Sequence, residues 1–137
     1  MQWDDSTNAG FSSAPASDLY IAMDPDKDRP TAKKEMAAPD SLYHEVKKLI
    51  RIRQSHKALQ SRGKITFVYA EKNAYPLAYI REDGDEKILV IINAAAEAKT
   101  FACDAEPKEA IYNFGAAAEA KNGKITVPAQ SAGFYRI

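Results

Sequence analysis

The order of apolar and polar positions between Tyr75 and Asn93 predicts a β-hairpin. In residues 77–82 successive side chains should point to opposite sides of the chain, which suits a strand with one covered face. Asp83-Gly84 follows, and this dipeptide between two apolar runs is a strong signal for a tight turn, because Gly accepts a positive φ at no steric cost. Ile88–Ile92 is aliphatic without interruption. Both faces of this second strand should therefore be covered.

A second pattern, over residues 39–62, predicts an amphipathic helix. Pro39 ends the preceding loop, and Asp40 or Ser41 can cap the first turn. Apolar residues then recur at a spacing that places them on one helix face, and Gly63 ends the helix. The members of this apolar stripe are Leu42, Val46, Leu49, Ile50 and Ile52. Since the stripe needs a partner, we expect it to cover one outer face of the predicted sheet.

Short apolar runs separated by turn residues fill the remaining section, residues 63–137. Asn122-Gly123 is another strong hairpin signal. About eight short strands at close spacing are typical of a sandwich or barrel. We predict a mainly β fold: an antiparallel Greek-key β-sandwich of about eight strands, with one packed N-terminal amphipathic helix and a long N-terminal loop. Besides the two arms of the first hairpin, the predicted strands are Ile65–Tyr69, Lys99–Cys103, Glu109–Asn113, Ala116–Ala120, Ile125–Val127 and Gly133–Ile137.

Residues 1–38 show neither the period of a strand nor that of a helix, and they are predicted to form a long loop. The segment is rich in Pro, Asp, Ser, Ala and Lys and has few aliphatic residues. A structureless loop of this length is unusual in a compact domain unless it is mobile or lies on something larger. The chain thus has three sections of different character: residues 1–38, 39–62 and 63–137.

Charge and cysteine content exclude several classes of partner. The 19 basic and 19 acidic residues cancel, which leaves no broad basic surface for nucleic acid or anionic lipid. No run approaches the roughly twenty apolar residues of a membrane helix. Neither nucleic acid nor a membrane is therefore expected as a partner. Cys103 is the single cysteine, which excludes an internal disulfide and fits a reducing, cytoplasmic location.

Local patterns for metal chemistry are weak. Asp24, Asp26, Asp28 and Glu35 have the acidic spacing of a calcium-binding loop. Arg29 stands where that loop needs Gly, and no helix precedes it, so a solvated acidic turn is expected. We expect neither a metal nor a cofactor.

Arg53 and His56 fall on or beside the apolar stripe of the predicted helix. They could satisfy buried acceptors at a packing interface, or His56 could act in catalysis. The first interpretation is favoured, because no residue near His56 in the sequence offers a nucleophile or an orienting carboxylate.

The first eleven residues, Met-Gln-Trp-Asp-Asp-Ser-Thr-Asn-Ala-Gly-Phe, resemble a segment found late in the chains of α-glucosidases and related enzymes of glycoside hydrolase family 13, the α-amylase family. The resemblance continues into the predicted sandwich and so spans essentially the whole chain. It implies that residues 1–38 are a loop from the end of a catalytic barrel, 39–62 the last barrel helix and 63–137 a C-terminal β-sandwich domain. The later matching segments are Pro39–Leu42, Val46–Arg53 with His56 and Ala58-Leu59, Ala78–Arg81, Ile88–Asn93 and Pro128–Ala132.

The resemblance also bears on the active site. Enzymes of this family are retaining glycosidases, which need two carboxyl groups about 5 Å apart, and the family carries them on barrel strands upstream of the Gln-Trp-Asp segment. No catalytic residue is therefore expected in this chain, which should hydrolyse nothing alone. Gln2, Trp3 and Asp4 would lie near the mouth of the active site and bind substrate once the barrel is present. Alternatively, Trp3 only anchors the loop to the barrel.

Three functions remain open. The favoured one is structural support for the barrel of an α-glucosidase-like hydrolase; its partners would be that barrel and, through the parent enzyme, an α-linked oligosaccharide. A glucosyl-transferring or isomerising relative such as a trehalose synthase would share the glycosyl-enzyme intermediate. A free-standing carbohydrate-binding or interaction module would instead need a row of exposed aromatic side chains, for which the candidates are Phe67, Tyr69, Tyr75, Tyr79, Tyr112, Phe114, Phe134 and Tyr135.

Overall fold

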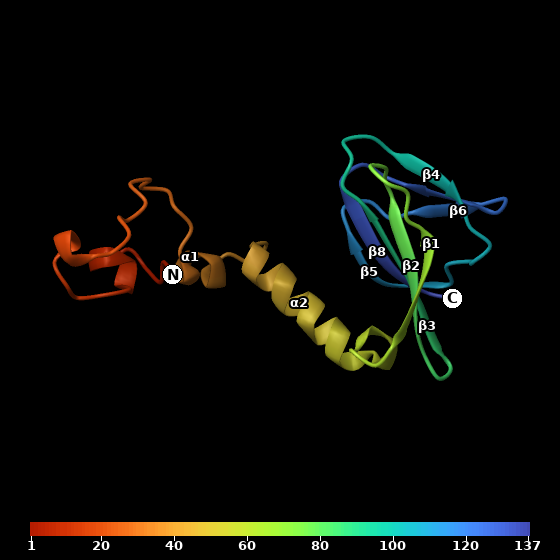
Figure 1. Cartoon of the computed structure of the whole chain (residues 1–137), viewed down its shortest axis with the longest axis horizontal. Coiled ribbons are helices and arrows are strands. Elements are labelled where there is room, and N and C mark those ends of the chain that lie inside the picture. Colours follow the sequence, from red (N-terminus) through yellow and green to blue (C-terminus); the bar gives the residue numbers. More distant parts are fainter. The chain divides into compact units, whose positions relative to one another are not determined.

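The computed structural model describes the whole chain, residues 1–137, and divides it into two compact units. The first unit is Met1–Arg51 and the second is Ile52–Ile137. All eight strands belong to the second unit, whereas the first contains two 3₁₀ segments, one short α-helix and most of a longer one, joined by irregular segments (Figure 1). None of the helices is both long and apolar enough to cross a membrane.

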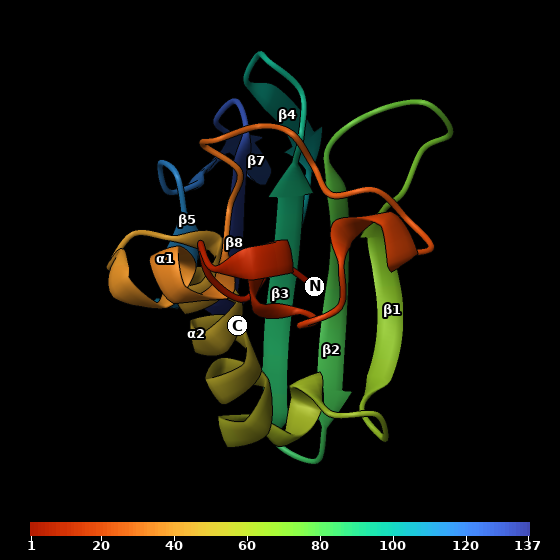
Figure 2. The same cartoon turned by 90° about the vertical axis from the view of Figure 1, so that its left-hand side faces the viewer.

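The second unit consists of two antiparallel sheets, which confirms the predicted mainly β sandwich. The larger sheet has the strand order β1-β2-β3-β8-β5, and the smaller has the order β4-β7-β6. Figure 2 shows β1, β2 and β3 side by side. The strands are β1 (Lys64–Tyr69), β2 (Leu77–Asp83), β3 (Glu86–Asn93), β4 (Lys99–Ala102), β5 (Glu109–Phe114), β6 (Glu119–Lys121), β7 (Lys124–Val127) and β8 (Ser131–Arg136).

Both predicted hairpins form, and one turn lies a residue later than expected. Asp83 pairs with Glu86 at the end of the β2–β3 ladder, so the connecting residues are Gly84-Asp85 rather than Asp83-Gly84. Gly84 still supplies the positive φ, at 59°. Asn122-Gly123 connects β6 and β7 with φ values of 52° and 69°, as a tight turn with two left-handed residues requires.

The central strand β3 is covered on both faces, as its uninterrupted aliphatic run predicts. Leu89 and Ile91 face the smaller sheet and belong to the main hydrophobic core. Ile88 and Val90 point the other way and pack with Ala58. Ala58 lies in η3 (Lys57–Leu59), a short 3₁₀ helix that follows the long helix. The 3₁₀ turn η3 thus covers part of this second face of β3, and the sequence pattern did not predict this turn.

The predicted amphipathic helix is α2, but it is shorter than expected. It runs over Leu42–Ser55, and the chain then leaves it for η3 instead of continuing to residue 62. No residue of α2 is buried. The stripe residues Leu42, Val46 and Ile50 are 73%, 45% and 52% exposed. Packing of this stripe against the sandwich stays a prediction.

Residues 1–38 are not the continuous irregular loop that was predicted, because they contain a short helix, α1 (Ala32–Ala37). Its residues, Ala-Lys-Lys-Glu-Met-Ala, are good helix formers. Thr31 caps α1 by accepting a hydrogen bond from the Lys34 N–H at 3.3 Å. Six residues are too few for helical periodicity to show in the sequence, so only the cap could have indicated this helix. Two 3₁₀ segments, η1 (Thr7–Gly10) and η2 (Ala16–Asp18), precede it.

Asn93, at the end of β3, joins three segments of the sandwich. Its side chain is almost completely buried. Nδ2 donates to the carbonyl oxygens of Glu97, Val127 and Pro128 at 3.0, 3.2 and 2.8 Å. Oδ1 accepts from the Ala95 N–H at 3.1 Å. This single amide therefore bonds backbone groups of both the β3–β4 and the β7–β8 connections, and the Val127 carbonyl group among them is buried.

We predict that Asn93→Asp destabilises the sandwich by about 2–4 kcal/mol, because a buried carboxylate cannot donate to the three carbonyl groups that Asn93 bonds. Asn122→Asp is the matched control, since it makes the same chemical change in the β6–β7 turn, where Asp also tolerates a positive φ. Urea unfolding at neutral pH followed by circular dichroism measures both. Equal midpoints for the two variants would contradict the role assigned to Asn93.

Candidate functional site

The segment predicted to bind substrate, Gln2 to Asp4, is held in the first unit by its backbone. The Trp3 N–H donates to the Ala9 carbonyl oxygen at 2.8 Å. The carbonyl oxygens of Gln2 and Trp3 accept from the N–H groups of Ala32 and Lys33, each at 2.9 Å. The opening residues are thus fixed between a tight turn on one side and the start of α1 on the other.

A run of left-handed residues closes this turn. Asn8, Ala9 and Gly10 have φ values of 51°, 53° and 69°. The side-chain amide of Asn8 stabilises this turn by donating to the carbonyl oxygens of Ser12 and Ala14 at 2.9 and 2.7 Å. Asn tolerates left-handed geometry better than most residues, whereas Ala pays a steric cost. The strain shows that the surrounding contacts, rather than local preference, hold this turn in shape.

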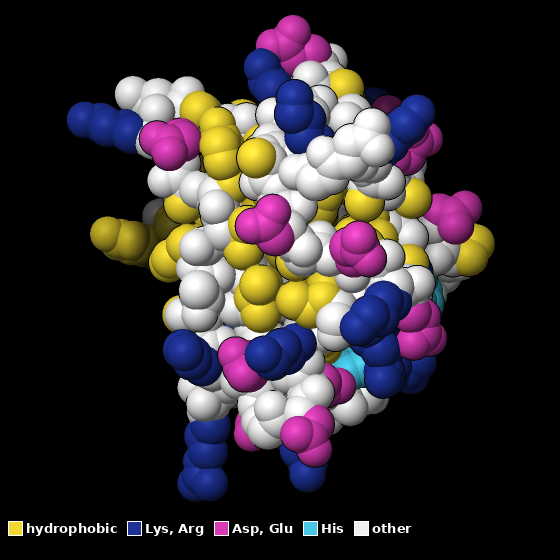
Figure 3. Space-filling view, turned by 90° about the vertical axis from the view of Figure 1, so that its right-hand side faces the viewer, with side chains coloured by type: hydrophobic (Ala, Val, Ile, Leu, Met, Phe, Trp, Pro, Cys, Tyr) yellow, Lys and Arg dark blue, Asp and Glu magenta, His cyan; other side chains and the backbone are white.

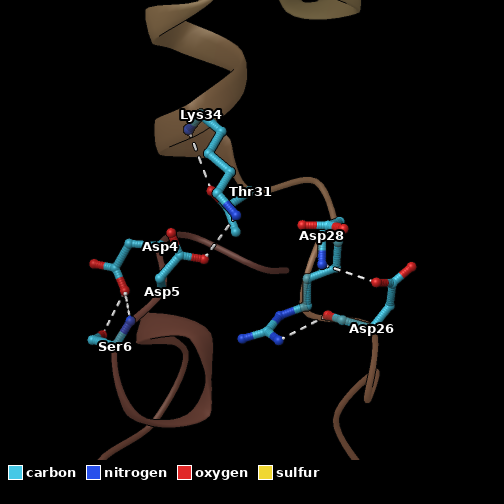
Figure 4. A network of polar contacts seen from close by, with 8 residues as sticks. Asp4, Asp5, Ser6, Asp26, Asp28, Thr31 and Lys34 are labelled. Atoms are coloured by element: carbon cyan, nitrogen blue, oxygen red, sulfur yellow. Dashed lines mark hydrogen bonds and ion pairs between the residues drawn. The ribbon is translucent and has the colours of Figure 1, made fainter.

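Asp4 and Asp5 have separate partners in the first unit (Figure 4). Asp4 Oδ1 accepts from the Ser6 N–H at 2.9 Å and from the Ser6 hydroxyl at 2.5 Å. These hydrogen bonds from Ser6, helped by the charge of Lys33, hold the pKa of Asp4 below its ordinary value. Asp5 forms an exposed ion pair with Lys34 at 3.1 Å. Asp4 is therefore a stably ionised acceptor.

The predicted binding residues Gln2, Trp3 and Asp4 thus lie on one fixed segment, but their side chains are not equally free to contact a ligand. The Trp3 side chain is 49% exposed, so part of the indole can meet a ligand. The Asp4 carboxylate already bonds Ser6. Substrate binding by Gln2, Trp3 and Asp4 stays a prediction.

Of the acidic residues with the spacing of a calcium-binding loop, Glu35 lies in α1, and the three Asp residues form turns. The N–H of Asp26 donates to Asp24 Oδ1 at 2.9 Å, and the N–H of Asp28 donates to Asp26 Oδ1 at 2.8 Å. Each carboxylate therefore bonds the backbone two residues further on, which is a common role of Asp in turns. Figure 4 shows the second of these contacts. The structure contains no group of three or more His, Cys, Asp or Glu side chains able to hold a metal ion.

A polar cluster in the second unit joins η3 to strands β2 and β3, and sequence reasoning missed it. His56 Nδ1 lies 2.6 Å from Glu86 Oε1. Because an ionised carboxylate only accepts, Nδ1 is the donor in this contact when Glu86 is charged. Glu86 Oε2 accepts from the Ala58 N–H at 2.9 Å. His56 does have an orienting carboxylate, contrary to expectation, but that carboxylate lies thirty positions away in the sequence.

Arg81 completes the cluster from β2. Its guanidinium donates to the carbonyl oxygens of Ala58, Gln60 and Gly63 at 3.1, 2.6 and 3.0 Å. Arg53, by contrast, makes one longer hydrogen bond, 3.3 Å, to the Leu59 carbonyl oxygen. His56 thus bonds a partly buried partner at a packing interface, as predicted, whereas the hydrogen bond of Arg53 is exposed.

The pKa of Glu86 reflects two opposing effects. Partial burial is the largest one and would raise it. Hydrogen bonds from the Ala58 N–H and the His56 ring, with the charges of His56 and Arg136, together outweigh burial and lower the pKa below its ordinary value. The ionised carboxylate is therefore the form that the cluster stabilises.

Comparisons with known proteins show which family the chain resembles. Residues 1–62 match a family model described as the α-amylase catalytic domain. A glucan 1,6-alpha-glucosidase of Streptococcus pneumoniae is 30% identical over 128 residues, covering 93% of this chain and 23% of that protein. An oligo-1,6-glucosidase of Parageobacillus thermoglucosidasius is 34% identical over 101 residues, covering 74% of this chain and 17% of that protein. The chain thus spans less than a quarter of the length of these relatives.

Nearly the whole chain also resembles part of a solved structure. The trehalulose synthase of Pseudomonas mesoacidophila matches with a TM-score of 0.79 at 29% identity, over 98% of this chain and 24% of that one. This chain belongs to the α-amylase family, glycoside hydrolase family 13, among its α-glucosidase-like members.

We predict that Gly10→Ala disturbs the opening segment. A Cβ atom at position 10 would lie 2.8 Å from Asp4 Oδ1, in a backbone with positive φ. Trp3 is the only tryptophan, so its fluorescence emission reports on this segment, and it should shift. Gly84→Ala is the matched control, because Gly84 also has positive φ but nothing within 4 Å. Unchanged Trp3 emission in the Gly10 variant would contradict the geometry of the turn.

We also predict that stability depends on the ionisation of Glu86. Because its pKa is lowered in the folded chain, Glu86 stabilises the fold fully above its ordinary value of 4.5. That contribution is lost as pH falls through the lower folded value. Glu86→Gln should cost about 1–2 kcal/mol near pH 6, and the difference from the wild type should shrink toward pH 3. Urea unfolding at several pH values measures this, and a difference independent of pH would refute it.

Proposed function

We propose that this chain is the C-terminal part of an α-glucosidase-like retaining glycoside hydrolase, and that its role is to support a catalytic barrel of which all but the last part lies outside these residues. The exposed stripe of α2 and the β-sandwich would each bury apolar surface in the complete enzyme. The chain alone would be inactive.

One observation carries this proposal. The match to the catalytic-domain model ends at residue 62, and the first strand of the sandwich begins at Lys64. The boundary between the two kinds of sequence therefore coincides with a boundary between structural elements. The small share of each relative that the chain covers supports the same interpretation.

The proposed substrate is an α-linked glucose oligosaccharide, by analogy with the names of the related 1,6-glucosidases. Gln2, Trp3 and Asp4 would contribute to one wall of its binding site. The backbone ties of this segment support such a role, because a binding residue on a fixed segment loses little entropy when a ligand binds. The half-exposed Trp3 indole offers an apolar face to a sugar ring.

An isomerising enzyme is the second candidate, and the likeness to a trehalulose synthase favours it. Hydrolysis and isomerisation by retaining enzymes share a glycosyl-enzyme intermediate and differ in the group that accepts the sugar. Water accepts it in hydrolysis. Residues outside this chain would then decide between the two reactions.

A free-standing carbohydrate-binding module finds less support in the sheet surface. Phe67 and Phe114 are 61% and 52% exposed. They lie on β1 and β5, which are the two edges of the larger sheet and are separated by three strands. Tyr112, also on β5, is buried, and its ring packs against that of Phe134 on β8 at a centroid distance of 5.2 Å. The rings thus pack together more than they form a continuous exposed platform.

The distribution of charge on the face of the molecule drawn in Figure 3 does not favour a charged ligand of either sign. There, basic and acidic side chains are scattered among apolar and uncharged ones. Such a surface would neither raise nor lower the affinity for a neutral oligosaccharide.

We predict that the purified 137-residue chain does not hydrolyse isomaltose, maltose or 4-nitrophenyl α-D-glucopyranoside. The physical reason is that retention needs two carboxyl groups on opposite sides of the scissile bond, supplied by the barrel. Release of glucose or nitrophenol measures this, with an intact oligo-1,6-glucosidase as the positive control. Turnover that persists after removal of contaminating enzyme would overturn the proposal. Calorimetric titration with the same sugars separates a binding module, which would bind them, from a supporting domain, which would not.

A further inference from the structure

The segment His56–Gly63 follows α2 and lies on the larger sheet, where two charged side chains contact it. Glu86, at the start of β3, accepts from the Ala58 N–H and contacts His56. Arg81, on β2, donates to three carbonyl oxygens of the same segment. One residue, Ala58, is thus held from both sides: its N–H by the carboxylate and its carbonyl group by the guanidinium.

The packing around this segment leaves little room. Ala58 is fully buried and packs with Ile88 and Val90 of β3. A Cβ atom at position 63 would lie 2.2 Å from the Ala58 carbonyl oxygen and 3.0 Å from Arg81 Nη2. Glycine is therefore required at position 63 by close approach, not by a special φ value.

We propose that Glu86 and Arg81 form a clamp that fixes His56–Gly63 as an ordered part of the sandwich unit rather than as a flexible linker after α2. Every contact of the clamp lies within this second unit, Ile52–Ile137. The clamp acts on residues that the catalytic-domain match still covers, because that match ends at residue 62. A segment with its backbone groups bonded to a sheet and its one alanine buried has little freedom to open locally.

The strength of the clamp comes from the number and kind of its hydrogen bonds. Those that involve a charged group are stronger than neutral ones, and the planar guanidinium can hold several acceptors at once. Lysine at position 81 would keep the charge but lose the fixed fork of donors.

Amide hydrogen exchange of the 137-residue chain tests this inference. Arg81→Lys removes the fork, and Gly63→Ala pushes on the Ala58 carbonyl group without changing any charge. Both should speed exchange of the Ala58 amide, and of the amides from His56 to Gly63, by about tenfold or more. The amides of Ile88–Ile91 in β3 should keep their protection. Glu82→Gln is the matched control, since it breaks only the more exposed Glu82–Lys87 ion pair at 3.2 Å on the same two strands.

Two outcomes would overturn the clamp. If exchange in His56–Gly63 is unchanged in both variants, the contacts do not hold the segment. If β3 amides lose protection by the same factor, the residues only contribute to general stability. The test involves neither a substrate nor turnover, so its result is independent of whether the parent enzyme is a hydrolase.

Discussion

The burial of β3 on both faces is the constraint on which the second unit depends. Leu89 and Ile91 need the smaller sheet, and Ile88 and Val90 need η3 and the aromatic side chains beside it. Each such side chain contributes about 1.5–3 kcal/mol when fully buried. The larger sheet and η3 therefore stabilise each other, because an uncovered face of β3 would leave part of this contribution unrealised. The position of the strand in the middle of its sheet follows from the same requirement.

Burying a strand also buries the backbone around its ends, and polar side chains resolve this at both. Glu86 begins β3 and bonds the chain that arrives from α2. Asn93 ends β3 and bonds the β3–β4 and β7–β8 connections at the opposite end. Both residues are polar because the backbone groups they meet have lost water and need partners. The apolar interior of the strand provides the stability, and its two polar ends specify which loops may lie against it.

The first unit is stabilised differently, because it has few buried apolar side chains and many local hydrogen bonds. Its left-handed turn, the Asn8 amide and the ties to α1 fix the opening residues without a large core. The side chains of such a fixed but barely buried segment remain accessible. Trp3 is half-exposed, and the stripe residues Leu42, Val46 and Ile50 of α2 are exposed as well.

The sequence by itself determined the sandwich, the helix, the hairpins and the family, because periodicity, turn residues and a specific opening motif are local signals. It did not reveal α1, whose six residues are too few to show a period, nor the end of α2 at Ser55. It also gave no sign that Glu86 and Arg81 would meet the residues after α2, since those pairs lie 18 to 30 positions apart. Such contacts arise only when strands pair and bring a distant loop onto the sheet, so the tertiary structure alone decided where His56 finds its carboxylate.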